Sequence, residues 1–269
     1  MAYRYSLAFL TVAELSPPEA VRVAARAGYD HVGLRLLPSG TEGPYPILSD
    51  TKLRRETQAT IAETGVTVAD IEIIRIAPDF NVKSTIPFLD CGATLGAKNI
   101  LVAGYDPNAN RMTQSFGAFC ELAQTYGMTA DLEFMPWTEI PNAKSAIAQL
   151  RAVDHDAAGI LVDALHVQRS DSPFEVIETI PPGWINYAQL CDAPSKFESD
   201  AESLIATARG NRLMPGDGSF DFNALLKALP KDIVLSIEVP QLERAGLVPA
   251  VDRAREALDK AKLVAQRKI

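Results

Sequence analysis

Short runs of apolar, often β-branched residues recur along the whole chain, and longer segments with apolar residues at helical spacing separate them. Several runs are unbroken Val, Ile and Leu, as expected of strands that are buried on both faces of a parallel sheet. About eight strands are predicted, at residues 5–10, 31–36, 66–74, 99–103, 128–134, 159–163, 185–190 and 233–239. The alternation predicts an α/β protein built from repeated strand-helix units.

Glycine residues stand where the helical segments end and the next strands begin. Gly28, Gly65, Gly96 and Gly127 each follow an apolar-periodic segment, at the position where a left-handed residue favours the end of a helix. At residues 16–19, Ser-Pro-Pro-Glu offers an N-cap, prolines in the first turn and an early acid. About eight such units in one chain match a single (β/α)8 TIM barrel.

The chain is expected to form one domain over residues 1–269, because no linker rich in Pro, Gly or Ser divides it. An open doubly wound sheet is the alternative α/β arrangement. Nucleotide-binding sheets of that kind carry GxGxxG after the first strand or GxxxxGK[ST], and the sequence contains neither. The last segment, residues 247–268, is predicted to be a closing helix.

Charge and cysteine content limit the partners and the compartment. Lys and Arg number 26 and Asp and Glu 34, which gives a net charge of −8, and no basic patch offers a nucleic-acid site. Cys91, Cys120 and Cys191 are far apart among apolar neighbours, as is typical of buried thiols in a reducing compartment. No run spans a bilayer and no signal peptide is evident. We therefore expect a cytoplasmic protein without nucleic-acid or membrane partners, and the sequence leaves a homo-oligomer open.

Oxygen-bearing side chains end the last four predicted strands. In a (β/α)8 barrel the catalytic groups lie at the carboxyl ends of the strands, and these positions hold Glu133, Asp163, Gln189 and Glu238. An all-oxygen set suits a hard or borderline divalent cation such as Mn²⁺, Mg²⁺ or Co²⁺, and we expect one such ion as cofactor. The structural alternative is that each acid caps a strand or pairs with an Arg.

Five motifs lie at these strand ends and before the last strand: LEFMPW at 132–137, VDALH at 162–166, AQLCDAP at 188–194, MPGDG at 214–218 and SIEVP at 236–240. In this order they resemble the xylose-isomerase-like TIM-barrel superfamily, the sugar phosphate isomerase/epimerase group. The resemblance spans essentially the whole chain. It implies one divalent metal held by a Glu, an Asp, a His or Gln, and a second Glu, roles that fall by position to Glu133, Asp163, Gln189 and Glu238.

The third position of that set departs from part of the group. Ketohexose epimerases and many inosose-processing relatives have His there, whereas Gln189 is similar to hydroxypyruvate isomerases and to bacterial 3-dehydroshikimate dehydratases. An amide oxygen is a neutral, hard donor, so the formal charge of the ligand set is unchanged. The residue leaves isomerisation and dehydration both open.

Four further residues are predicted to contact a substrate. His166 follows Asp163 by three residues, a spacing that in the resembling group places the His beside a substrate oxygen. Arg75, after the third predicted strand, and Arg212, before the Pro-Gly-Asp-Gly turn, offer planar donor forks to an anionic or polyhydroxyl substrate. Trp137 is placed to wall the pocket. The structural alternatives are ion pairs for the arginines, a backbone-bonded His and plain packing for the Trp.

Other polar residues are expected to serve structure. His31 begins a strand, and His155 lies in an acidic stretch at the far end of the barrel. Arg169 is expected to be a solvated loop residue. Two roles stay open for Asp192: it pairs with Arg212, or it supports the site near Gln189.

The predicted chemistry is proton transfer next to a carbonyl. Glu133 and Glu238 would act as acid and base on opposite sides of a hydroxyketone, while a Lewis-acid ion stabilises the enediolate. We therefore expect a metal-dependent isomerase or epimerase of a small keto-sugar or related polyol, with Glu133, Glu238 and His166 as catalytic residues.

Two alternatives stay open and one is disfavoured. A dehydratase of the 3-dehydroshikimate or keto-inositol type would use the same enolate to expel a β-hydroxyl. An inactive sugar-binding barrel would bind no ion. Endonuclease IV shares the superfamily but uses many histidines, and this chain has three His and a net charge of −8.

Overall fold

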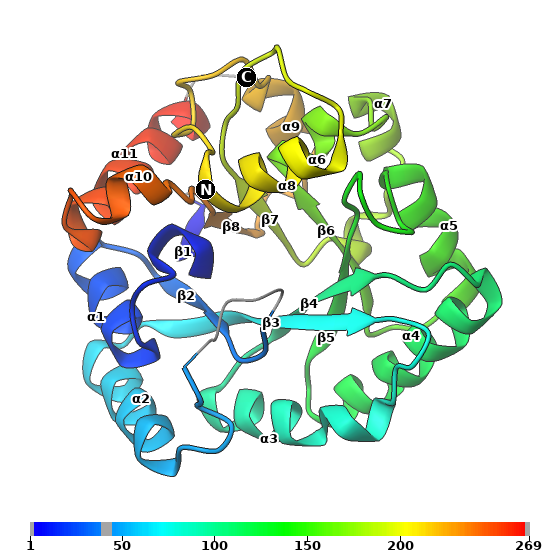
Figure 1. Ribbon diagram of the computed structural model, residues 1–269, viewed down its shortest axis with the longest axis horizontal. Helices are drawn as coiled ribbons and strands as arrows, with labels where there is room; N and C mark the ends of the chain where they lie inside the picture. The colour runs from blue at the N-terminus through cyan, green and yellow to red at the C-terminus, as the bar shows by residue number, and fades with distance from the viewer. Residues whose placement is uncertain (1–2, 39–44, 267–269) are drawn as a thin grey trace.

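Eight parallel strands form a closed barrel in which each strand pairs with its neighbours in chain order, from β1 to β8 and back to β1 (Figure 1). The computed structural model describes residues 3–38 and 45–266. The strands are β1 (Arg4–Leu7), β2 (His31–Arg35), β3 (Thr67–Ile76), β4 (Asn99–Gly104), β5 (Thr129–Glu133), β6 (Ala158–Asp163), β7 (Tyr187–Leu190) and β8 (Val234–Ile237). The predicted (β/α)8 barrel is confirmed.

Helices form a ring around the barrel (Figure 1). They are α1 (Pro17–Ala27), α2 (Thr51–Thr64), α3 (Ile86–Leu95), α4 (Ala109–Thr125), α5 (Ala143–Val153), α6 (Ala164–Arg169), α7 (Phe174–Ile177), α8 (Ala201–Gly210), α9 (Phe222–Ala228), α10 (Leu242–Ala245) and α11 (Ala250–Gln266), with 3-10 turns at Phe9–Val12, Val82–Thr85 and Pro182–Trp184. The predicted closing helix is α11, although its predicted end at Lys268 lies outside the described residues. None of the described helices is long and apolar enough to cross a membrane.

Backbone geometry at the helix ends agrees with the sequence. Gly28, Gly65, Gly96 and Gly127 have φ values of 94°, 74°, 77° and 69°, a region that only glycine enters without a steric penalty. Each glycine precedes the next strand by a few residues. The glycine positions therefore set the register at which one strand-helix unit ends and the next begins.

Several strand boundaries differ from the prediction, and those of β1 and β3 have a clear structural reason. Residues 9–12 form a 3-10 turn rather than the end of β1, because the Thr11 hydroxyl donates to the Ile237 carbonyl at 2.8 Å and accepts from the Val239 amide at 2.8 Å. These bonds fix the turn beside β8. In contrast, β3 runs on to Ile76 and pairs with β4 at Arg75, so Arg75 lies within the strand instead of after it.

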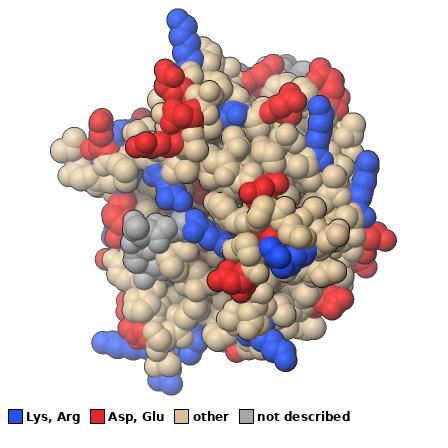
Figure 2. Space-filling model, turned by 45° about the vertical axis from the view of Figure 1, so that its right-hand side comes forward, with Lys and Arg blue, Asp and Glu red and all other residues tan. Residues whose placement is uncertain are grey.

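Two apolar clusters hold the barrel together. The larger one fills the space between the strands and the helix ring, and it includes all three cysteines as buried, free thiols. The smaller one lies inside the barrel and consists of Ile73, Leu101, Ala103, Met135, Leu161 and Tyr187. On the face drawn in Figure 2, acidic and basic side chains alternate, and the basic ones form no continuous surface.

Asp131 is a buried carboxylate on β5, deeper in the barrel than the strand end. It accepts a hydrogen bond from Asn186 Nδ2 at 2.6 Å and another from Thr129 Oγ1 at 2.7 Å, and Gly159 leaves the room that its carboxylate occupies. Burial raises the pKa of Asp131 to about 6, against the opposing effect of these hydrogen bonds. The folded state therefore binds a proton at this site more tightly than the unfolded chain.

This shift predicts a pH-dependent effect of Asp131→Asn. Below about pH 4 the carboxyl is protonated in the folded and the unfolded state, and above about pH 6 it is ionised in both. The free energy of unfolding of the wild-type therefore falls by up to about 3 kcal/mol between these values. The amide oxygen can still accept from Asn186 Nδ2, and the amide NH2 can donate to the Thr129 hydroxyl, so the polar contacts remain without the buried charge. The variant should gain stability over the wild-type as the pH rises from 4 to 7 in denaturant titrations, whereas the exposed Asp79→Asn should not. A difference that is constant with pH would contradict this account.

Candidate active site

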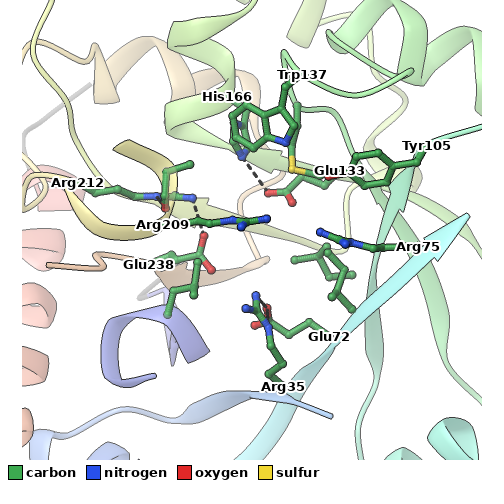
Figure 3. A pocket seen from close by; sticks show the side chains of 15 residues that line it. Arg35, Glu72, Arg75, Tyr105, Glu133, Trp137, His166, Arg209, Arg212 and Glu238 are labelled. Atoms are coloured by element: carbon green, nitrogen blue, oxygen red, sulfur yellow. Dashed lines mark hydrogen bonds and ion pairs between the residues drawn. The ribbon is translucent and has the colours of Figure 1, made fainter. Parts of the chain in front are cut away.

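A pocket opens at the carboxyl ends of the strands, and six of the predicted site residues line it: Arg75, Glu133, Trp137, His166, Arg212 and Glu238 (Figure 3). The other two, Asp163 and Gln189, are fully buried beside these residues. The four predicted metal ligands lie at or near the carboxyl ends of the last four strands. Glu133 and Asp163 end β5 and β6, Gln189 lies in β7, and Glu238 follows β8.

The turn from β6 into α6 fixes the first part of the site. Asp163 caps α6, and its Oδ1 accepts the backbone N–H groups of Leu165 at 2.7 Å and His166 at 3.2 Å. This cap holds the carboxylate in place and starts the helix turn that carries His166. One ligand atom each from Glu133, Asp163 and His166 lie within 4.8 Å of one another, and His166 Nε2 is 3.5 Å from Glu133 Oε1.

Arg212 joins this group to Glu238. Its Nη1 donates to Asp163 Oδ2 at 2.6 Å, and its Nη2 lies 2.9 Å from Glu238 Oε2. The Nε group donates to the Ala208 carbonyl at 2.9 Å, which fixes the plane of the guanidinium. Gln189 Nε2 completes the chain of contacts by donating to Glu238 Oε1 at 3.1 Å. Arg212 is thus an ion-pair partner of two predicted metal ligands, which is the structural alternative to its predicted contact with substrate.

Burial and mutual repulsion shift the acids of this site. Burial raises the pKa of Glu133 well above its usual range, and the charges of Asp163 and Glu238 raise it further. Burial raises the pKa of Glu238 to about 8, against the attraction of Arg212. Burial would also raise the pKa of Asp163, but Arg212 and His166 hold it below its ordinary value. Three acids therefore share one guanidinium, and the two glutamates are disfavoured in their ionised forms.

The residues present fit a divalent cation. Gln189 Oε1 is a buried acceptor with no hydrogen-bond partner among the described residues. Burial lowers the pKa of His166 to about 4, so its imidazole is neutral at pH 7 and has a lone pair to donate. Together with three acids that share one guanidinium, these donors suit a bound ion. The identity of the ion does not follow from the donor set.

Two aromatic side chains shape the walls of the pocket. The indole of Trp137 packs edge-to-face on the His166 ring, with centroids 5.1 Å apart and planes at 77°. The second is Tyr105, whose ring centroid lies 5.1 Å from the guanidinium carbon of Arg75. Trp137 therefore lies where it was predicted, as a wall of the pocket, and it also restrains the His166 ring.

The pocket contains four residues that were not predicted: Arg35, Glu72, Tyr105 and Arg209. Arg35 Nε donates to Glu72 Oε2 at 3.1 Å, and both side chains are buried. Arg35 ends β2, so the strand-end rule that found Glu133 would have found it. Glu72 lies inside β3, and its signal is a charged residue within an apolar strand. Arg209 gives no such signal, because it lies in the last turn of α8, where sequence periodicity does not reveal a pocket.

The expectation for Arg169 was wrong. Its side chain is buried rather than solvated, with Nη2 donating to the Pro194 carbonyl at 2.8 Å and the guanidinium carbon 4.0 Å from the centroid of the Phe197 ring. The reason is that α6 packs against the loop after β7. His31 and His155 serve structure as expected: His31 Nδ1 lies 2.6 Å from Thr67 Oγ1, and His155 Nδ1 accepts the Ala157 amide.

Asp192 is a structural residue of the loop between β7 and β8 and does not pair with Arg212. Its carboxylate accepts the backbone N–H groups of Gly216, Gly218 and Phe220 at 2.9 to 3.0 Å. A side chain at Gly218 would collide with this carboxylate. An internal acid therefore occupies the cradle of amides that this loop forms.

Comparisons with known proteins agree with the fold. The chain aligns over 97% of its length with a fusion protein of a xylose isomerase-like TIM barrel and a 4-hydroxyphenylpyruvate dioxygenase (20% identity, TM-score 0.79), and it spans 42% of that protein. It also aligns with the IolI protein with a bound zinc atom (18% identity, 99% of both chains, TM-score 0.80). A third match is the probable 3-DHS dehydratase AsbF of Bacillus anthracis (16% identity, 98% and 100% of the chains, TM-score 0.74).

No curated protein sequence matches the chain. A family model described as xylose isomerase-like TIM barrel matches residues 21–263, which include every residue of the site described above. That span covers far more than half of the chain and agrees with the resemblance of the five motifs. The chain therefore belongs to the xylose isomerase-like TIM barrel family.

Proposed function

We propose that this protein is a divalent-metal-dependent isomerase or epimerase that moves a proton at the carbon next to the carbonyl of a small hydroxyketone. The observation that carries the proposal is the pair Glu133 and Glu238. Both line the same pocket, they come from β5 and from the end of β8, and burial raises the pKa of each. Carboxyl groups with raised pKa values are suited to take and return protons near neutral pH.

Glu133, Asp163, Gln189 and Glu238 would hold the ion, and His166 is a further donor beside Glu133. When bound, the ion supplies Lewis-acid stabilisation of negative charge on substrate oxygens. Asp163 is the most suitable fixed ligand, because the α6 backbone and Arg212 already restrain both of its oxygens and keep it ionised. Gln189 adds an oxygen without adding charge.

The side chains divide the remaining work. One of Glu133 and Glu238 removes the proton and the other returns it, to the neighbouring carbon in an isomerase or to the opposite face in an epimerase. His166 is neutral and is held by the Trp137 ring, so it donates a hydrogen bond to a substrate oxygen without changing its charge. Trp137, Met135 and Leu101 line the same pocket and limit access of water to the reacting carbon.

The second candidate is a lyase, in which proton removal is followed by loss of a β-hydroxyl. A specific observation favours it: four arginines line the pocket, which suits an acidic substrate better than a neutral ketose. A structural neighbour is named as a probable 3-DHS dehydratase. The two candidates share the first step and differ only in what the intermediate loses or regains.

Metal-dependent exchange with solvent tests the shared step. The chelated protein, and the protein reloaded with Mn²⁺, Mg²⁺, Co²⁺ or Zn²⁺, would be incubated in D₂O with neutral ketoses and with 3-dehydroshikimate. We expect deuterium at the carbon next to the carbonyl only in the reloaded samples, as read by NMR. An unchanged skeleton indicates an isomerase or epimerase, and an ultraviolet-absorbing dehydrated product indicates a lyase. Absence of exchange with every substrate and metal would refute the proposal.

A further inference from the structure

Two arginines extend into the pocket from opposite walls. Arg75 comes from β3, and Arg209 comes from the last turn of α8, three residues before Arg212. Figure 3 shows their guanidinium groups reaching toward the middle of the pocket, Arg209 from the side of Arg212 and Arg75 from the side of Tyr105. The contact with the Tyr105 ring orients the plane of the Arg75 guanidinium.

The pocket is less acidic than the protein that contains it. The chain has a net charge of −8, yet the described lining residues include four arginines and only three acids, Glu72, Glu133 and Glu238. Asp163 beneath them brings the formal balance to zero before any cation is counted. A divalent ion would make the site positive, and a positive pocket in an acidic protein favours an anionic ligand.

The four arginines differ in position. Arg35 lies against Glu72, and Arg212 lies against Asp163 and Glu238, so these two hold the framework of the site. Arg75 and Arg209 are the pair that Figure 3 shows aimed at the open centre. A ligand placed between them would lie within reach of Glu133, Glu238 and His166, which line the same cavity.

The anionic group fits a carboxylate better than a phosphate. Barrels often bind phosphate through backbone amides of the loop after strand seven, but Asp192 already accepts the amides of Gly216, Gly218 and Phe220 in that loop. The wall near Arg75 is apolar, with Ile73, Leu101 and the Tyr105 ring. A planar carboxylate on a mostly hydrocarbon body matches planar guanidinium forks in such surroundings.

We propose that Arg75 and Arg209 bind the carboxylate of a small hydroxyketone acid, and that Arg209 selects the acid over a neutral sugar. For the reaction that follows, the inference rests on the proposed function. For binding it stands alone, because recognition of a carboxylate needs no proton transfer. The substrate class is thus a polyhydroxylated keto acid, whose ketone faces the glutamates and whose carboxylate faces the two arginines.

The test uses pairs of ligands that cannot be enolised and that differ in charge. Shikimate and its methyl ester form one pair, gluconate and sorbitol the other, and inorganic phosphate is a separate probe. Their affinities for the metal-loaded protein would be measured by calorimetry. We expect at least one acid to bind ten-fold or more tightly than its neutral partner. Arg209→Gln should reduce that affinity about 10- to 100-fold, as the loss of a charge-assisted hydrogen bond predicts, and should leave the neutral partner unaffected.

Matched variants keep the result interpretable. Arg151→Gln removes an exposed arginine of α5 and should change nothing, and Arg209→Lys should keep part of the preference for the acid. Arg75→Gln serves as the second test if Arg209→Gln does not fold. The inference is overturned if neither acid binds more tightly than its neutral partner, if Arg209→Gln weakens both members of a pair equally, or if phosphate is the preferred anion. Acid binding without deuterium exchange would instead refute only the proposed reaction.

Discussion

Glu133→Gln is expected to lower kcat for proton exchange by about 10²- to 10⁴-fold, the usual contribution of a general acid or base. The amide cannot take up the substrate proton, yet it has almost the same shape as the carboxyl and keeps one oxygen donor. The fold should tolerate the change. Burial already raises the pKa of Glu133 well above its usual range, so the ionised carboxylate is unfavourable in the folded state and its replacement by a neutral amide removes that penalty. The rate of deuterium incorporation, read together with the metal content, measures the effect.

Glu238→Gln provides the complementary measurement. In an isomerase or epimerase one glutamate removes the proton and the other returns it. Because Glu133→Gln is expected to block exchange, Glu238→Gln should permit exchange without forming product. Glu139→Gln, an exposed change six residues after Glu133, should retain full activity. Retained exchange in both Glu133→Gln and Glu238→Gln, with the metal still bound, would show that neither glutamate moves the proton.

The fold was predictable because its information is local and repeated. Each strand is a short apolar run, and a glycine such as Gly96 marks where the preceding helix must end, so the order of elements follows from spacing alone. The boundaries that failed depend on contacts between distant segments. Thr11 turns the chain after β1 only because the backbone of β8 is beside it, and no local pattern contains that contact.

The site was predictable for residues that end strands and not for the others. A barrel brings strand ends together, so Glu133, Asp163, Gln189 and Glu238 could be assigned to one place before any coordinates existed. The role of Arg212 could not be assigned, because it depends on how the loop after α8 folds back over Asp163 and Glu238. Arg209 could not be assigned for a similar reason. Whether a residue in the last turn of a surface helix faces the pocket depends on how that helix packs against the barrel.

Arg212→Met is expected to destabilise the metal-free protein by about 3–5 kcal/mol, the usual cost of removing one partner from a buried ion pair. Arg212 is almost fully buried, and it is the guanidinium that contacts both Asp163 and Glu238, at 2.6 and 2.9 Å. Without it, Asp163 and Glu238 lose the guanidinium that contacts them both in a low-dielectric site. The free energy of unfolding of the chelated protein, from denaturant titrations, measures this loss.

Because a divalent ion would replace the lost positive charge, adding Mn²⁺ should stabilise Arg212→Met more than it stabilises the wild-type. This comparison separates an electrostatic role from simple packing, since a ligand stabilises the folded state only through its affinity for that state. Arg212→Lys keeps the charge but not the two-sided contact and should fall between the two proteins. If Mn²⁺ raised the stability of all three equally, Arg212 and the ion would act independently. The carboxylates that Arg212 holds would then not be the ones that bind the metal.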